Sequence, residues 1–487
     1  MHMIDLLSRM NYMLMQGNMD KEVSAVVYDS RKIIPNCIFV CMPGAVTDGH
    51  IYAKAAIEAG ASALVISHEL DFTPPADTTI LFVENPRLAL AELSAAWFGH
   101  PAEKLTTIGV TGTKGKTTTT YMIRSMLESA GLSTGLIGTI EVICGEQHIP
   151  AVNTTPESWL VQKYFADMVA AGNRYVVMEV SSQAMKLDRV SGFTFDYGIF
   201  TNLEEDHIGP GEHEDMAEYI ACKSKLFRQC RVGLANAEAD YLDQVMAGRT
   251  CALETFGMGE GADLRAVNIR RIHEPGVLGV EYDLTGLEQY HVRVDIPGDF
   301  TVYNSLAAIA LCRHLGISRE AILKALAVIQ VKGRLEIVNT PGDYTLMIDY
   351  AHNAMSLEAL LNNLRSYGPE RIICLFGCGG NRAKSRRFEM GEVSSRLADV
   401  TVVTSDNPRN EEPMDIINDI LVGVRKADGA YVTIPDRKEA IRWCMDQGRK
   451  GDVIVLAGKG HEDYQEIRGV KHHMDERELI ADILAGR

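Results

Sequence analysis

The 487-residue chain lacks several features that identify whole classes of protein. It has no Cys-x-x-Cys pair, and its ten cysteines are scattered, several of them inside apolar segments. Zinc sites and disulfide frameworks are therefore not expected, and the cysteines are interpreted as small buried hydrophobic residues. No apolar run approaches the roughly 20 residues that span a membrane, and the start of the chain lacks the basic and apolar regions of a signal peptide. These absences predict a cytoplasmic protein.

An excess of positive charge is also missing. The chain has 48 Lys and Arg against 65 Asp and Glu, which gives a net charge of -17. Nucleic-acid surfaces need clustered Lys and Arg, so neither a nucleic acid nor a membrane is expected as a partner. An anionic small-molecule substrate would need a locally basic pocket. No short-period repeat or low-complexity tract is present, and no pattern predicts an oligomeric state.

Short apolar segments alternate with helical patterns along almost the whole chain. The clearest segments are residues 105–110, 175–180, 344–350, 372–376, 400–404 and 453–457. This alternation predicts an α/β fold in which helices cover mainly parallel sheets. The length suits two to four domains, and three blocks are predicted, at residues 1–101, 102–331 and 332–487. Residues 247–294 are expected to form an antiparallel addition to the central block.

A glycine-rich loop lies between an expected strand and an expected helix. It consists of Gly112, Thr113, Lys114, Gly115, Lys116, Thr117 and Thr118. The strict Walker pattern fails, because Val110 stands where that pattern requires glycine. In this context, however, backbone N–H groups can surround phosphate oxygens, Lys116 can neutralise the outer phosphates and Thr117 can ligate magnesium. Phosphate binding is favoured over the alternative, an ordinary glycine turn before a helix.

Three further positions in the central block are candidates with weaker patterns. Glu179 closes a buried strand-like segment, where a carboxylate is rarely kept unless it is paired or binds a metal. A solvent-facing glutamate is the alternative. His207 lies in an acidic turn after the next apolar segment, and such a turn is usually only a solvated loop. Lys223 lies on an amphipathic helix, where spacing alone predicts an ordinary surface lysine.

Four polar turns follow expected strands in the third block. They are residues 349–352, 377–382, 406–409 and 458–463. Because the carboxyl ends of parallel strands meet at one edge of a sheet, these turns predict one composite pocket. Arg382 and Arg409 suit carboxylate recognition, because a guanidinium group binds a carboxylate through two hydrogen bonds.

With these motifs in this order, the chain resembles the Mur ligase family over essentially its whole length, most closely at residues 349–465. The resemblance implies three domains: a first domain for a UDP sugar, a central P-loop ATPase domain with a parallel sheet, and a Rossmann-like third domain that presents an amino acid. It also implies ATP and Mg²⁺ as cofactors. Substrates held between domains gain the orientation that a condensation reaction needs.

The resemblance assigns roles to residues of this sequence. For ATP it implies the loop residues Gly112, Thr113, Lys114, Gly115, Lys116, Thr117 and Thr118, with Asn304, Arg334, Asp349 and His352. For the UDP substrate it implies Ser30, residues 44–48, Asn153, Thr154, Thr155, Ser181 and Arg189. For the amino acid it implies Arg382, Asp406, Asn407, Pro408, Arg409, Gly458 and Glu462. For catalysis it implies Lys116, Glu179, His207 and Lys223. The implied metal ligands are Thr117, Glu179, His207 and Lys223, the last as a carbamate.

The implied reaction is the ATP-dependent addition of meso-diaminopimelate to UDP-N-acetylmuramoyl-L-alanyl-D-glutamate through an acyl phosphate. It would belong to peptidoglycan precursor synthesis, and so to cell wall biogenesis, cell shape and cell division. Arg409 closes an Asp-Asn-Pro-Arg turn that resembles the diaminopimelate-adding type. A second carboxylate on the amino acid can pair with Arg409, whereas a lysine ammonium would be repelled. Glu462 would bind the distal ammonium.

The chain departs from the family pattern at several positions. Lys114 stands for asparagine, Gln183 for histidine and Thr301 for asparagine, and residues 208–213 and 353–355 also differ. Two alternatives therefore stay open. One is a ligase of the same fold that adds L-lysine or uses another acyl acceptor. The other is a non-catalytic nucleotide-binding paralogue, against which the presence of the implied catalytic residues argues.

Overall fold

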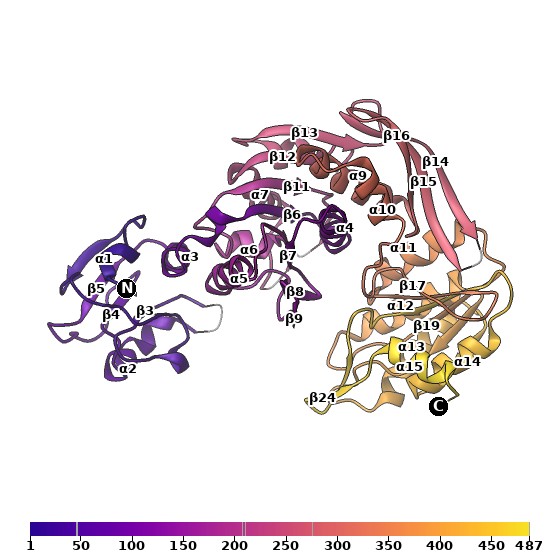
Figure 1. Ribbon diagram of the computed structural model, residues 1–487. Helices are drawn as coiled ribbons and strands as arrows, with labels where there is room; N and C mark the ends of the chain where they lie inside the picture. The colour runs from indigo at the N-terminus through magenta and orange to yellow at the C-terminus, as the bar shows by residue number, and fades with distance from the viewer. Residues whose placement is uncertain (45–46, 207, 210, 275, 487) are drawn as a thin grey trace. The chain divides into compact units, whose positions relative to one another are not determined.

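The computed structural model describes residues 1–44, 47–206, 208–209, 211–274 and 276–486 (Figure 1). The described chain forms two compact units. The first comprises Met1–Arg265 and Leu306–Ile322, and the second comprises Ala266–Ser305 and Leu323–Arg487. Three larger sheets are rich in parallel strands, and the predicted α/β class is confirmed. No helix in the described ranges is both long and apolar enough to span a bilayer.

The first sheet contains five strands in the order β1-β5-β4-β3-β2. They are β1 (Met13–Gln16), β2 (Val26–Val27), β3 (Ile38–Val40), β4 (Ala63–Ile66) and β5 (Thr79–Phe82). The helices of this region are α1 (Met3–Leu6), α2 (Ala53–Glu58) and α3 (Pro86–Trp97). Side chains of β3 alternate between two cores: Ile38 packs in the core that contains Leu90 of α3, and Phe39 in the core that contains Ala56 of α2. This period of two explains why β3 and β4, which are buried on both faces, are apolar throughout.

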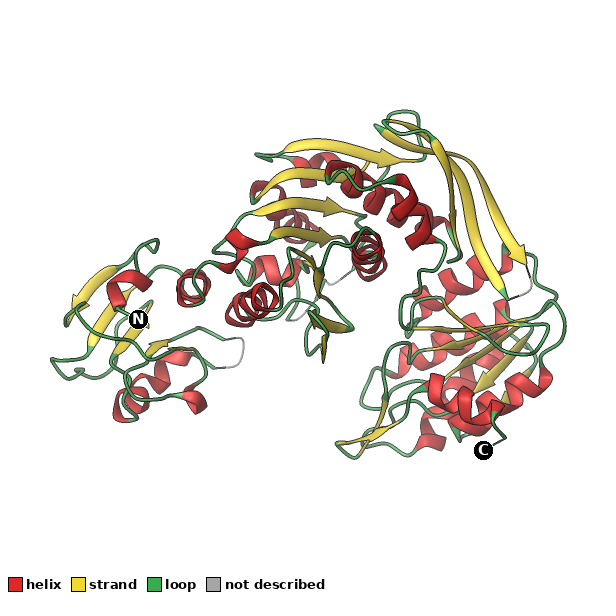
Figure 2. Ribbon diagram, viewed as in Figure 1, coloured by secondary structure: helices red, strands yellow, loops and turns green. Residues whose placement is uncertain are grey.

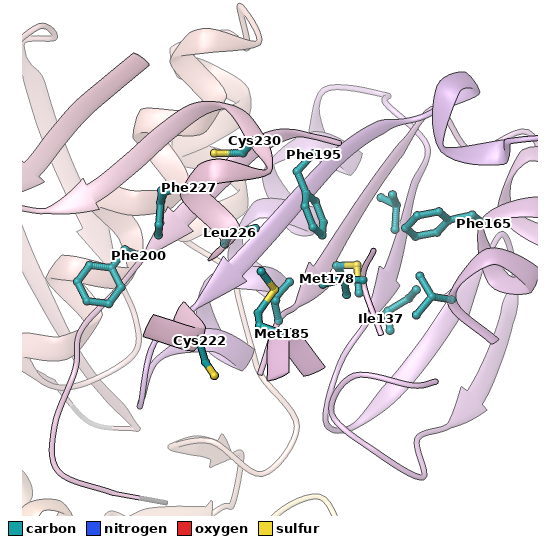
Figure 3. Packing of buried hydrophobic residues seen from close by; sticks show 14 of the residues in the cluster. Ile137, Phe165, Met178, Met185, Phe195, Phe200, Cys222, Leu226, Phe227 and Cys230 are labelled. Carbon is teal, nitrogen blue, oxygen red and sulfur yellow. The ribbon is translucent and has the colours of Figure 1, made fainter. Parts of the chain in front are cut away.

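The second sheet has 11 strands in the order β16-β15-β14-β13-β12-β11-β6-β10-β7-β8-β9. Its parallel strands include β6 (Thr106–Thr111), β7 (Thr134–Ile137), β10 (Tyr175–Glu179), β11 (Phe195–Phe200), β12 (Cys230–Asn236) and β13 (Ala252–Gly257). Antiparallel strands β8 (Glu141–Cys144) and β9 (Gln147–Pro150) extend one side. The helices are α4 (Lys116–Ser129), α5 (Ser158–Ala170), α6 (Ser182–Lys186), α7 (Met216–Arg228) and α8 (Leu242–Met246). Figure 3 shows Phe165 of α5 and Phe227 of α7 in the core against this sheet.

The prediction for residues 247–294 was partly wrong. β13 continues the parallel sheet, because α8 carries the chain back to the starting end of the sheet before β13 begins. β14 (Leu264–Glu274) also pairs parallel with β13, and the boundary between the two units falls within β14. Antiparallel pairing joins β15 (Val277–Gly286) to β16 (Tyr290–Val294). The helices α9 (Asp299–His314) and α10 (Arg319–Leu326) follow.

The third sheet, in the second unit, has six strands in the order β17-β18-β22-β19-β20-β21. They are β17 (Glu336–Val338), β18 (Thr345–Asp349), β19 (Ile372–Phe376), β20 (Val400–Val403), β21 (Tyr431–Thr433) and β22 (Val453–Ala457). Helices cover both faces (Figure 2), and they are α11 (Ala354–Arg365), α12 (Lys384–Leu397), α13 (Pro413–Lys426), α14 (Arg437–Gln447) and α15 (Glu476–Leu484). All strands except β17 are parallel. A separate hairpin consists of β23 (Tyr464–Ile467) and β24 (Val470–His473).

Candidate active site

The glycine-rich loop connects the end of β6 to the start of α4, as the sequence predicted. Gly112 and Gly115 have φ angles of 155° and 83°. A Cβ atom on Gly112 would lie 2.0 Å from Thr201 Oγ1, so only glycine fits there. Lys116 folds back over the loop and donates to the carbonyl oxygens of Gly112 and Thr113, both at 2.9 Å. The loop thus presents a helix N-terminus and an ammonium group together, which suits an anion such as phosphate.

Glu179 lies at the end of β10 and is 1% exposed, which excludes the solvent-facing alternative. Its carboxylate accepts hydrogen bonds from the hydroxyl groups of Thr117 and Thr139, both at 3.0 Å, and from the Thr139 N–H at 2.8 Å. The Thr117 hydroxyl and the Glu179 carboxylate therefore meet directly beside the loop. Hydroxyl and carboxylate oxygens are suitable ligands for Mg²⁺, so this pair fits the implied cation.

Lys223 is buried on α7 rather than lying on the surface, and it is 1% exposed. Its Nζ lies 4.6 Å from the centroid of the Tyr219 ring, and the Tyr219 hydroxyl is 3.0 Å from Thr113 Oγ1 of the loop. Burial, followed by the charge of Lys116, lowers the pKa of Lys223 well below its usual value. A lowered pKa favours the neutral amine of lysine, and the neutral amine is the form that reacts with carbon dioxide. His207, the remaining member of the predicted catalytic set, lies outside the described residues.

Lys114, the first departure from the family pattern, pairs with an acidic residue of the neighbouring loop. Its Nζ lies 2.6 Å from Glu204 Oε2, and both side chains are about one-third exposed. Its backbone N–H donates to Asn202 Oδ1 at 2.9 Å, and its carbonyl accepts from the Thr201 hydroxyl at 2.8 Å. The loop is thereby attached to the segment that follows β11.

Three of the residues assigned to the UDP substrate lie together. The Thr155 hydroxyl donates to the carbonyl of Glu179 at 2.8 Å and accepts from the Ser181 N–H at 3.1 Å. Arg189 donates to the Thr155 carbonyl at 3.2 Å. Thr154 lies 3.1 Å from the Thr139 hydroxyl, while the nearby Asn153 is exposed. Thr155 thus joins Ser181 and Arg189 to the end of β10, and Thr154 contacts Thr139, a partner of the Glu179 carboxylate. Ser30 lies in the 3-10 helix η1 (Ser30–Lys32) beside the first sheet.

Asp48 ends the segment 44–48 that was assigned to the UDP substrate, and it forms a cluster with two histidines. Residues 45–46 of this segment lie outside the described ranges. Asp48 accepts from His50 Nδ1 at 2.6 Å and from His68 Nε2 at 2.8 Å, and the two rings stack at 3.7 Å. The Ser67 N–H donates to His50 Nε2 at 3.0 Å, so the proton of His50 is on Nδ1. That nitrogen is then a donor and not a metal ligand. The cluster thus anchors the loop through hydrogen bonds, and the spacing of its residues in the sequence gave no signal for it.

In the second unit, the four predicted turns do follow the carboxyl ends of neighbouring strands, β18, β22, β19 and β20. The Gly458 N–H donates to the Asp349 carbonyl at 3.0 Å, and a Cβ atom on Gly458 would lie 3.2 Å from Asp406 Oδ2. A Cβ atom on Gly377 would lie 2.5 Å from the Thr404 carbonyl. The turns are therefore in direct contact along one edge of the sheet, as predicted, and the composite pocket at this edge stays a prediction.

The Asp-Asn-Pro-Arg turn is largely buried up to Arg409, which has a φ of 51°. Arg409 Nε donates to Glu466 Oε2 at 3.1 Å, and one of its terminal nitrogens donates to the Gly380 carbonyl at 2.8 Å. Its other terminal nitrogen has no hydrogen-bond partner in the described part of the chain. Arg382, which closely follows Gly380 in the sequence, is exposed. Glu466 was not singled out from the sequence, because a strand glutamate 57 residues away carries no local signal for this contact.

Four residues assigned to the nucleotide also lie in the second unit. The Asp349 carboxylate accepts from the Leu335 and Ala351 N–H groups at 2.9 and 2.8 Å, and burial raises its pKa. The Arg334 guanidinium lies 4.8 Å from the centroid of the Tyr350 ring. The remaining two are His352, which is exposed, and Asn304, which is buried in α9.

Comparisons with known proteins agree along the whole chain. Three family models match in succession: "Mur ligase family, catalytic domain" at residues 22–98, "Mur ligase middle domain" at 110–312 and "Mur ligase, glutamate ligase domain" at 333–460. The chain is 41% identical to the UDP-N-acetylmuramoyl-L-alanyl-D-glutamate–2,6-diaminopimelate ligase of Clostridium perfringens, over 99% of each chain.

Two solved structures share the fold of this chain over almost its whole length. A structure of a UDP-N-acetylmuramoyl-L-alanyl-D-glutamate–2,6-diaminopimelate ligase matches 100% of this chain and 99% of its own, with a TM-score of 0.73 and 24% identity. The MurF ligase of Thermotoga maritima, solved in complex with ADP, matches 95% of this chain and 97% of its own, with a TM-score of 0.56 and 17% identity.

Proposed function

The chain belongs to the Mur ligase family, and on that premise we propose that it adds meso-diaminopimelate to UDP-N-acetylmuramoyl-L-alanyl-D-glutamate with consumption of ATP. The observation that carries the proposal is the contact between Thr117 and Glu179 beside the loop of Lys116, within a chain that matches ligases of this name end to end. The reaction would supply a peptidoglycan precursor, in the cytoplasm, and so serve cell wall biogenesis and the cell cycle.

The proposed reaction has two steps. The D-glutamyl side-chain carboxylate attacks the terminal phosphoryl group of ATP, which gives an acyl phosphate and ADP. The amine of the amino acid then attacks the acyl carbon, phosphate leaves, and the nitrogen loses a proton. Lys116 would offset the negative charge that develops on the phosphoryl oxygens. Mg²⁺, held by Thr117 and Glu179, would supply further positive charge at those oxygens.

Lys223 supports the proposal in its carbamylated form. Its low pKa favours the neutral amine, and attack of this amine on carbon dioxide gives an anionic carbamate and a proton. The carbamate would convert a costly buried cation into an oxygen ligand for the same magnesium site. His207 is retained as the proposed fourth member of this site.

The amino-acid pocket is proposed at the edge of the third sheet. Glu466 and Gly380 hold Arg409 from two sides, which leaves guanidinium N–H groups for the distal carboxylate of diaminopimelate. Glu462, 18% exposed at its side chain, would accept the distal ammonium. Asp406, Asn407, Pro408, Gly458 and Arg382 would complete the pocket. L-Lysine is the second candidate donor, and Arg409 disfavours it because its charge would face the ammonium of lysine.

Magnesium-dependent phosphate release with UDP-N-acetylmuramoyl-L-alanyl-D-glutamate tests the function directly. We expect release with meso-diaminopimelate and much less with L-lysine. Preference for lysine would overturn the argument from Arg409. Absence of release with either amino acid would overturn the proposed ligase activity and favour the non-catalytic alternative.

Substitution of Arg409 tests the pocket. Arg409→Ala should raise the KM for diaminopimelate by about 30-fold or more, as expected for the loss of a charge-assisted bond, and leave the KM for ATP nearly unchanged. Arg425→Ala, at a surface position on α13, is the matched control and should change neither constant. Equal increases in both KM values for Arg409→Ala would contradict the assigned contact.

A further inference from the structure

Lys459 is a completely buried lysine in the turn after β22, with 0% exposure. Its Nζ donates to Asn407 Oδ1 and to Glu462 Oε2, both at 2.9 Å, and to the carbonyl of Tyr464. These contacts use all three N–H bonds of the ammonium group. No role was assigned to this residue from the sequence.

Asn407 completes a triangle with Lys459 and Glu462. Its Nδ2 donates to Glu462 Oε2 at 2.9 Å, and its Oδ1 accepts from the Glu466 N–H at 2.9 Å as well as from Lys459. Two donors therefore hold the same oxygen of Glu462. The other carboxylate oxygen, Oε1, has no hydrogen-bond partner within the described ranges of the chain.

Burial of the Lys459 ammonium group costs folding free energy, and a role in the pocket would account for that cost. Transfer of an ammonium group into the interior carries a large desolvation cost, and a methionine of similar length would fill the same volume without it. Lys459 is fully buried, whereas its charge partner Glu462 remains 18% exposed at the pocket edge. The buried cation thus holds a carboxylate that faces outward.

We propose that Lys459 is a positioning residue of the amino-acid site, which orients Glu462 so that Oε1 receives the distal ammonium of the substrate. This inference rests on the proposed function. Lys459 also fixes the amide of Asn407, whose Nδ2 is the second donor to Glu462. Without Lys459, Glu462 keeps one donor and gains freedom to turn away from the substrate.

A substrate analogue separates positioning from general stability. 2-Aminopimelate has the carbon chain and both carboxylates of diaminopimelate but lacks the distal amine. Lys459→Met should raise the KM for diaminopimelate about tenfold or more, change the KM for 2-aminopimelate little, and leave the KM for ATP unchanged. The preference for the diamino acid, measured as the ratio of the KM for 2-aminopimelate to the KM for diaminopimelate, should therefore be smaller in the variant than in the wild-type protein. An unchanged preference would overturn the proposal.

Two further variants distinguish a loss of positioning from a general loss of stability. Arg371→Met removes an ion pair with Asp452 at the opposite end of the same sheet, so it should lower the melting temperature without changing the preference. Lys459→Arg keeps the charge but displaces its donors, and its KM for diaminopimelate should lie between those of wild type and Lys459→Met. If Arg371→Met changes the preference as much as Lys459→Met does, the positioning role is wrong.

The wild-type protein separates failure of this inference from failure of the proposed function. If it prefers L-lysine to diaminopimelate, the proposed donor is wrong, and the Lys459 variants are compared with L-lysine and L-norleucine, which also differ only by the distal amine. An unchanged preference between those two overturns the inference as well. If wild type releases phosphate with neither diamino acid, both proposals fail.

Discussion

Three lysines of the candidate site lie in three different electrostatic environments. Lys116 donates to carbonyl oxygens of its own loop. Lys223 is buried against the Tyr219 ring, with its pKa lowered. Lys459 is buried with three acceptors around its ammonium group. The same residue type can therefore bind an anion, react as a neutral amine, or hold a carboxylate in place, depending on its surroundings.

Lys116→Ala tests the loop. Loss of the ammonium group should reduce ATP-dependent phosphate release by at least about 100-fold, because the charge that develops on the phosphoryl group is no longer offset. Lys163→Ala removes a partly exposed lysine that pairs with Asp167 on α5, and it should retain wild-type turnover. Substantial ligation by the Lys116 variant would show that the loop assignment is wrong.

Lys223→Met tests the buried amine through the pH dependence of stability. The pKa of Lys223 is lower in the folded protein than in the unfolded chain, where it is near 10.5. Between these two values the unfolded chain binds more protons, so the stability of wild type rises with pH. In buffer free of carbon dioxide, the variant should therefore melt about 1–3 °C above wild type at pH 7, with a smaller difference near pH 10.

Activity completes that test. Lys223→Met should lose ligase turnover by about 100-fold or more, since it cannot form a carbamate. A variant that is active, or whose stability difference from wild type grows with pH, would contradict the assignment.

At the scale of elements, the β23–β24 hairpin extends the Asp-Asn-Pro-Arg turn like an added strand. The Arg409 N–H donates to the Glu466 carbonyl at 3.0 Å, and the Arg468 N–H donates to the Arg409 carbonyl. The Gln465 side chain also donates to the carbonyl of Asp406 at 2.6 Å. The hairpin therefore stabilises the arginine that we assign to the amino-acid carboxylate.

Arg468→Asn should stabilise this hairpin. Arg468 and Gly469 form its two-residue loop, with φ angles of 49° and 78°, and asparagine followed by glycine is favoured in such turns. We expect the free energy of unfolding in urea to rise by about 0.5 kcal/mol, since Arg468 is exposed and its ion pair with Glu412 is weak. Gly469→Ala should lower it by about 1 kcal/mol. A destabilised Arg468→Asn variant would mean that its side chain makes a larger contribution than the turn.

The elements that the sequence predicted well are those whose burial is uniform. Residues 372–376 and 453–457 coincide with β19 and β22, because strands covered on both faces need apolar side chains at every position. Within residues 247–294 the predicted antiparallel direction was wrong for β13 and β14, because alternation shows that a segment is a strand and not which way it runs.

The glycine loop and the edge turns were predictable, because the succession of strand, turn and helix along the chain is enough to place them. Lys459 and Glu466 were missed, since their partners Asn407 and Arg409 lie 52 and 57 residues away. Lys223 was assigned as a carbamylated metal ligand through the family resemblance. Only its burial in the structure accounts for the neutral amine that carbamylation requires.

At the scale of the whole molecule, all ten cysteines are free thiols and nine of them are buried. Burial raises thiol pKa values, to about 12 for Cys41 and Cys374, which further suppresses the reactive thiolate. We predict that an aromatic disulfide reagent labels one thiol rapidly in the native protein, at the partly exposed Cys251, and all ten after unfolding. Rapid labelling of several thiols in the native state would contradict this burial.

The strand order of the third sheet has a consequence for synthesis of the protein. β22 lies between β18 and β19, although it follows both by about 80 residues or more in the chain. While the ribosome is still making residues before 453, β18 and β19 have no shared neighbour, and each presents an open edge for incorrect pairing. The amino-acid pocket therefore forms only when the last part of the chain emerges, and a nascent chain that stalls earlier already carries the complete phosphate loop but no place for the incoming amine.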